Sequence, residues 1–184
     1  MKHLLVFVLL VTALSGCLSL TNNAIDQLMK SVPFPESTHL LYSTNVDNGK
    51  IALIIDESGF RTAFYSNRIN NWNITGNADA NPKDGFSWTM LNAPYIPIVI
   101  FGGVINDDNI TTVLVKQRTL SKQAYVINLN QGRYWYVLFD TLEQPEMNES
   151  DPLKIEAIEK NGEVLWKNGI YEDGFFSGRI TKQK

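Results

Sequence analysis

Two Asn-Gly pairs, Asn48-Gly49 and Asn161-Gly162, constrain the fold of this 184-residue chain more than any other feature. A tight hairpin turn needs a positive φ at its central residues, and Asn and Gly tolerate this conformation better than other residues do. Each pair separates two short segments that are rich in β-branched and aliphatic residues: 39–46, 50–56, 153–160 and 163–166. The sequence therefore predicts a β-hairpin at each pair.

The rest of the chain after Pro35 continues the same pattern. Further short apolar runs are separated by turn-forming residues at intervals of roughly ten residues, which is typical of sandwiches and barrels. These runs cover residues 60–66, 86–91, 96–104, 110–116, 124–129 and 133–140. Nothing beyond Pro35 keeps a helical period. We predict an all-β fold, an antiparallel sandwich-like domain over residues 38–184.

Residues 67–85 interrupt this pattern. Asn, Gly, Asp and Ala dominate the stretch, and Trp72 and Ile74 break it. It predicts a long loop with at most one short strand, and long loops in compact domains are often functional or mobile.

The N-terminus predicts export. A basic start, Met1-Lys2-His3, precedes an apolar run from Leu4 to Leu14 and the small residues Ser15-Gly16. This arrangement is typical of a secretory signal peptide. The run is too short for a membrane-spanning helix, which needs about 20 apolar residues.

Leu14-Ser15-Gly16-Cys17 resembles the lipobox of bacterial lipoproteins. The resemblance implies that Cys17 receives a diacylglyceryl group and becomes the first mature residue, so that the protein is extracytoplasmic and anchored to the cell membrane. Cys17 is the single cysteine of the chain, so it cannot form an intramolecular disulfide. The alternatives are a plain signal peptide with a chance cysteine and a buried N-terminal strand.

These features divide the chain into three parts. Residues 1–16 are the predicted signal peptide, and 17–37 are the lipidated N-terminus and its tether. Residues 22–30 are either a short helix, with Ile25, Leu28 and Met29 on one face, or a flexible linker. Pro33-Phe34-Pro35 ends any helix before the β domain begins.

The mature part resembles a group of uncharacterised small lipoproteins and secreted proteins of Gram-positive spore-forming bacteria. The resemblance covers residues 38–168 and lies in the order of segments: the first Asn-Gly hairpin, the Trp-bearing loop, Pro97 to Ile105, Arg133 to Val137, and Lys154 to Leu165. It implies an extracytoplasmic β domain and the outer leaflet of a Gram-positive membrane, while an outer-membrane location stays open. It implies no activity.

Charge argues against nucleic acid as a partner. The chain has 16 basic and 19 acidic residues, and removal of residues 1–16 takes away one lysine. The mature protein is thus mildly acidic, whereas nucleic-acid binding needs a clustered basic face.

Catalytic and metal-binding patterns are weak. His39 is the single histidine of the mature chain, and no Gly-x-Ser-x-Gly motif supplies a nucleophile. A zinc site needs three or four Cys, His or carboxylate ligands, and the mature chain has one histidine and one cysteine. The oxygen-rich segments 77–81 and 106–109 fit turns better than calcium-binding loops. We predict no cofactor and no metal. Glycoside hydrolysis stays an alternative, because it needs only a pair of carboxylates. The candidate carboxylates are Asp56, Glu57, Asp140, Glu143 and Glu156.

Aromatic residues are the remaining candidates for recognition. In Tyr134-Trp135-Tyr136 the rings alternate between the faces of one strand, which favours core packing. Trp72 lies in the Asn-rich loop, and we predict that a binding surface would lie at Trp72, Trp88 and the loop that joins them. The sequence thus favours a non-enzymatic binding module of the cell envelope, with a protein or glycan partner. The alternatives are an envelope sugar-binding or glycoside-hydrolysing protein and a purely structural envelope protein.

Overall fold

The computed structural model describes residues 24–147 and 150–180, and it confirms the predicted all-β, antiparallel, sandwich-like fold. One helix, residues 24–31, precedes the strands. The strands are β1 (His39–Val46), β2 (Gly49–Asp56), β3 (Gly59–Ser66), β4 (Asn71–Ile74), β5 (Thr89–Leu91), β6 (Val99–Ile105), β7 (Ile110–Lys116), β8 (Ser121–Gln123), β9 (Tyr125–Leu129), β10 (Gly132–Phe139), β11 (Lys154–Glu159), β12 (Val164–Tyr171) and β13 (Gly174–Arg179).

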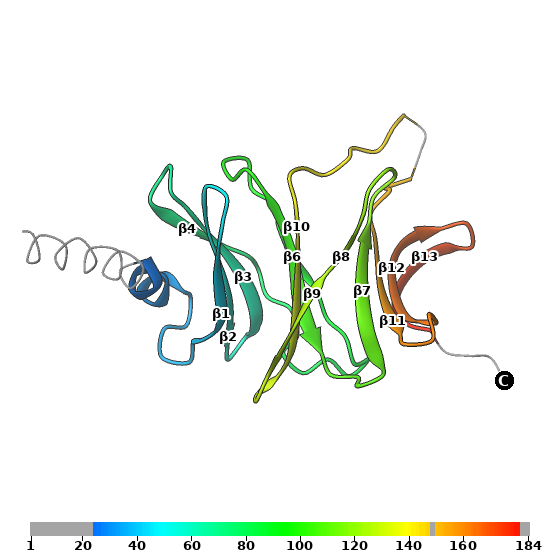
Figure 1. The fold of residues 1–184 in the computed structure, drawn as a ribbon, viewed down its shortest axis with the longest axis horizontal. Coiled ribbons are helices and arrows are strands. Elements are labelled where there is room, and N and C mark those ends of the chain that lie inside the picture. Colours follow the sequence, from blue (N-terminus) through cyan, green and yellow to red (C-terminus); the bar gives the residue numbers. More distant parts are fainter. Residues whose placement is uncertain (1–23, 148–149, 181–184) are drawn as a thin grey trace, which may run out of the picture.

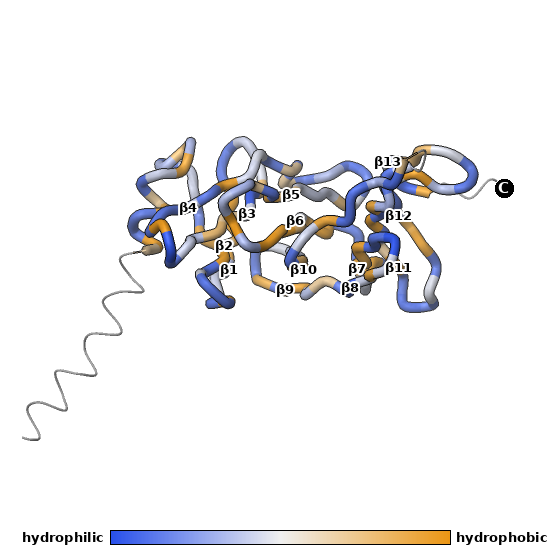
Figure 2. Tube along the Cα trace, turned by 90° about the horizontal axis from the view of Figure 1, so that it is seen from above, coloured by the Kyte–Doolittle hydropathy of each residue, from blue (hydrophilic) through white to orange (hydrophobic). Residues whose placement is uncertain are grey.

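The strands form three antiparallel sheets that stack face to face (Figure 1). Sheet A has the order β1-β2-β3-β4, sheet B the order β5-β6-β10-β9, and sheet C the order β13-β12-β11-β7-β8. One buried cluster joins sheets A and B, and a second joins sheets B and C. Sheet B is therefore covered on both faces, which explains the apolar colour along β6 in Figure 2.

Strand β10 shows how one segment serves both cores. Tyr134 and Tyr136 pack into the core between sheets A and B, whereas Trp135 packs into the core between sheets B and C. The Tyr134 ring stacks on Phe60, with centroids 5.9 Å apart, and the Trp135 ring stacks on Phe86 at 5.4 Å. The alternation expected from the sequence, and the core role of these rings, are confirmed.

Two glycines in β6 let other parts of the chain approach sheet B closely. A Cβ at Gly103 would overlap the carbonyl oxygen of Ser87, and a Cβ at Gly102 would lie 2.7 Å from Cγ2 of Thr62. Only glycine leaves room for both contacts, because any side chain would force the neighbouring backbone apart.

The helix packs on the outer face of sheet A. Ala24, Leu28 and Val32 form a third buried cluster with residues of β2, β3 and β4, and Leu28 is completely buried. Residues 24–31 therefore form a helix that packs on sheet A. Of the two alternatives for this segment, a short helix or a flexible linker, the helix is the one that forms. The helix stops just before Pro33, as the sequence predicts.

Both Asn-Gly hairpins form, but their turns differ from the prediction. Val46 pairs with Gly49, so the turn residues are Asp47 and Asn48, and only Asn48 has a positive φ, of 63°. Gly49 is needed for another reason: its missing side chain makes room for the carbonyl oxygen of Tyr65. At the second hairpin only Gly162 has a positive φ.

Two strands, β8 and β13, were not predicted from the sequence. β8 lies in the chain between β7 and β9, which were predicted. β13 pairs with β12, which continues to Tyr171, beyond its predicted end. Both additions are rich in Gly, Lys, Gln or Ser, which have low strand propensity, so tertiary pairing decides their conformation.

Candidate ligand-binding groove

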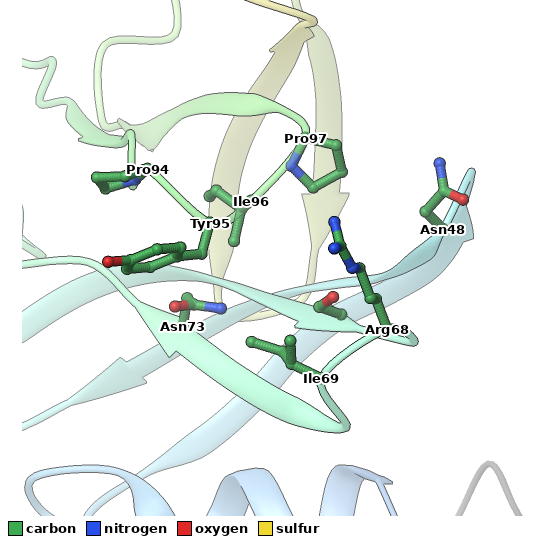
Figure 3. Close-up of a pocket in the computed structure, with 9 residues that line it drawn as sticks. Asn48, Arg68, Ile69, Asn73, Pro94, Tyr95, Ile96 and Pro97 are labelled. Atoms are coloured by element: carbon green, nitrogen blue, oxygen red, sulfur yellow. The ribbon is translucent and has the colours of Figure 1, made fainter.

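A groove opens between sheets A and B, next to the β1–β2 and β3–β4 turns and the connection from β5 to β6 (Figure 3). Its volume is about 650 Å³, within the range that proteins use for small ligands. The residues that line it come from four segments of the chain: Asn48, Ser66, Arg68, Ile69, Asn73, Pro94, Tyr95, Ile96 and Pro97.

Turns of both sheets build the walls. The β1–β2 turn supplies Asn48, the β3–β4 turn supplies Arg68 and Ile69, and the edge strand β4 supplies Asn73. The opposite wall is the connection from β5 to β6. A hydrogen bond from Ile96 N to Ala93 O, 3.1 Å long, and the fixed φ of the two prolines hold this connection in a tight turn.

Two polar side-chain groups of the groove have no partner among the described residues. The side-chain nitrogen Nδ2 of Asn73 is buried and makes no hydrogen bond within the described residues. Arg68 reaches from the β3–β4 turn toward Pro97, and no ion pair joins it to any residue of 24–147 or 150–180 (Figure 3). An unpaired amide is costly in a buried position, so an external acceptor would relieve that cost.

Apolar surface surrounds these two groups. Ile96 and the two prolines cover the groove from the side of sheet B, and Ile69 faces them from the β3–β4 turn. The side chain of Tyr95 stands at the rim and is 83% exposed, and Ile69 is 47% exposed. Large apolar side chains that remain exposed around a hollow are typical of a binding site.

Trp72 does not contribute to this surface. Its side chain is only 6% exposed and lies in the cluster between sheet A and the helix. The indole N–H donates a hydrogen bond to Ala24 O at 2.7 Å, and the ring packs against Tyr65. The sequence left the burial of Trp72 open, and the structure buries it, because β4 joins sheet A and turns this ring toward the helix.

Trp88 lies in a different layer. It is half-buried and packs against the core between sheets B and C, with its ring 6.2 Å from that of Phe101. Trp72 therefore lies in the layer between the helix and sheet A and Trp88 in the layer between sheets B and C, and the structure does not bring them together as one binding surface.

Cys17, the predicted lipidation residue, lies outside the described residues. Within the described part of the chain, no helix is both long and apolar enough to cross a membrane.

Two of the candidate carboxylates, Asp56 and Glu156, lie on different sheets. Asp56 is on sheet A, where it binds Arg61 through Nε at 2.8 Å, and Glu156 is on sheet C, where it binds Lys116 and Tyr171. Sheet B separates the two. Glu143 accepts hydrogen bonds from Thr119 in a surface loop. His39 begins β1 as an exposed residue.

The oxygen-rich turns are held by internal hydrogen bonds. Asp79 accepts from the backbone of Asn81, and the Asn81 side chain accepts from Asn106 at 2.8 Å. Asp107 pairs with Arg179 and accepts from Asn109. No group of three or more metal-ligating side chains occurs in the part of the chain that the structure describes.

The sequence singled out the 67–85 loop, but the two residues predicted for a binding surface, Trp72 and Trp88, do not line the groove. Arg68 and Ile69 are part of that loop and line the groove, whereas Tyr95 and its two flanking prolines were not recognised. The available signal was the cluster Pro94-Tyr95-Ile96-Pro97, which places apolar side chains in a turn, where they cannot all be buried.

Comparisons of the chain with protein-family models, with curated proteins and with solved structures gave no match.

Proposed function

We propose that this protein is a membrane-anchored, extracytoplasmic lipoprotein that binds a ligand in the groove between sheets A and B and does not transform it. One observation carries the binding role: a groove with largely apolar walls holds the exposed guanidinium of Arg68 and the buried amide nitrogen of Asn73, neither of which has a partner among the described residues. An anionic ligand would pair with the guanidinium, which is otherwise solvated by water.

The lipobox-like sequence around Cys17 supports the anchor. Two acyl chains hold a protein stably on a bilayer, because each buried methylene contributes about 0.8 kcal/mol.

The composition of the groove supports binding over catalysis. Ser66 provides a hydroxyl, but the lining contains no histidine and no carboxylate that could activate it. Glycoside hydrolysis, the alternative, needs two carboxylates across one ligand, and the buried Asp56 and Glu156 lie on different sheets.

Photo-crosslinking on intact cells tests the binding site. A benzophenone amino acid replaces Tyr95 at the rim of the groove, and in a matched control it replaces Phe175 on β13, a side chain that is 69% exposed. We expect a discrete mass adduct on the Tyr95 variant alone. Equal labelling of the two variants, or none at Tyr95, would contradict a ligand in the groove.

Membrane fractionation tests the anchor separately. Cys17→Ala should release the protein from the membrane or leave it unprocessed. A variant that is cleaved before residue 17 and still sediments with membranes would contradict lipidation.

A further inference from the structure

We infer that the ligand of the groove is an amphiphile with one carboxylate and an unbranched acyl chain, that is, a fatty-acid-type molecule. This inference rests on the proposed binding function and names its ligand class.

The charges of the groove select an anion. Arg68 is the one ionisable cation among the nine lining residues, and no acidic side chain lines the groove to oppose it. Its guanidinium is exposed and forms no ion pair with the described residues, and Asn73 Nδ2 is a buried donor without a partner among them. A carboxylate offers acceptors only, so it matches such a set of donors.

The walls select an unbranched apolar body. The two prolines and the isoleucines Ile69 and Ile96 offer no side-chain hydrogen-bonding groups. An acyl chain buries its methylenes against such walls without leaving any polar group unpaired. A sugar would bring many hydroxyls, each of which needs a partner that these four residues do not supply.

An extended peptide fits less well. Each peptide unit carries an N–H and a C=O that both need partners, and the prolines and isoleucines of the walls have no side-chain group to supply them. Pairing with the nearby edge strand β4 is also limited, because Trp72 N already donates to Asn71 Oδ1 at 2.9 Å.

Calorimetry on the full-length lipidated protein in phosphatidylcholine nanodiscs, with empty nanodiscs subtracted, tests the inference. The probes are decanoate, decanol and hexanoate. We expect saturable binding of decanoate and up to about fivefold weaker binding of decanol, because pairing with an exposed guanidinium contributes up to about 1 kcal/mol. Hexanoate should bind much more weakly, since each pair of methylenes is worth about a factor of ten when buried.

Variants locate the site. Arg68→Gln should reduce the affinity for decanoate to that for decanol, and Arg68→Lys should restore part of the loss. Asn73→Leu should weaken decanoate binding without loss of folding, because it replaces an unpaired buried amide with an apolar group of similar size. The matched control is Lys160→Gln, which removes an exposed cation from the β11–β12 turn and should leave affinity unchanged.

Equal affinities for decanoate and decanol, or an Arg68→Gln protein that binds decanoate normally, would overturn the carboxylate assignment. Displacement of decanoate by a short acidic peptide of higher affinity would replace the acyl chain with a peptide. If decanoate fails to bind while the Tyr95 crosslink forms, the ligand class is wrong and the binding function stands. Failure of both removes the groove as a binding site.

Discussion

At the level of single residues, Asp56 shows how a buried charge is stabilised, because its side chain is fully buried. One oxygen accepts hydrogen bonds from the backbone and hydroxyl of Ser58 and from Gly59 N, and the other accepts from Arg61 Nε. Burial alone would raise the pKa of Asp56, but these hydrogen bonds and the charge of Arg61 outweigh it and hold the pKa below its usual value. The pair thus fixes the β2–β3 turn.

The low pKa of Asp56 gives a signed prediction. A carboxyl whose pKa is lower in the folded than in the unfolded state adds stability above its unfolded pKa, and this stability is lost as the pH falls through the folded value. We expect Asp56→Asn to cost about 3 kcal/mol at pH 7, because it leaves Arg61 buried without its counter-charge. The cost should shrink below about pH 4.

Urea denaturation at pH 7 and at pH 3 measures this difference. Asp107, whose pKa is also lowered by its hydrogen bonds to Asn109 and Arg179 against the effect of burial, remains in the variant and preserves part of the pH dependence. A cost that is the same at both pH values would show that the charge of Asp56 is not what stabilises the turn.

At the level of elements, the helix and sheet A depend on each other. The outer face of β2 and β3 carries Ala52, Ile54 and Ala63, which the helix covers. A helix of eight residues is not stable alone in water, so this packing and the bond from Trp72 to Ala24 hold it in place.

Leu28→Ala tests the docking of the helix. The side chain of Leu28 is completely buried, so the substitution should cost about 2–4 kcal/mol of the free energy of unfolding and make residues 24–31 sensitive to proteases. The matched control is Gln27→Ala, an exposed position on the same helix, which should change stability little. Equal stability of the two variants would mean that the helix does not pack as described.

At the level of the whole molecule, sheet B links two cores. Sheet A is built from one continuous part of the sequence, 39–74, whereas the strands of sheets B and C alternate along the chain. Strand β10 supplies side chains to both cores, so neither core can form completely without it.

This arrangement predicts one cooperative unfolding unit. Native-state hydrogen exchange should give the same free energy for the buried amides of Leu53 in sheet A and Ile155 in sheet C, because the loss of sheet B would expose both cores. A clearly lower value for Leu53 would show that sheet A and its helix unfold as a separate unit.

The predictable part of the fold depends on local signals. Strands with continuous or alternating apolar residues were found almost to the residue, as in β1 and β7. The strands β8 and β13 were missed, because their sequences are polar or rich in glycine and their pairing partners, not their own propensities, define them. The role of Gly49 was misread for a similar reason: a neighbouring strand, and not the turn, requires it.

By itself the sequence determined the β class, both hairpins and the alternation along β10, because these follow from turn chemistry and from the two-residue period of a strand. Only the tertiary structure decided that three sheets stack, that Trp72 is buried against the helix, and that Arg68, Asn73 and the turn at Tyr95 meet in one groove. The physical reason is that the face on which a side chain finds its neighbours depends on which strands pair and which sheets stack, and these contacts join residues far apart in the chain.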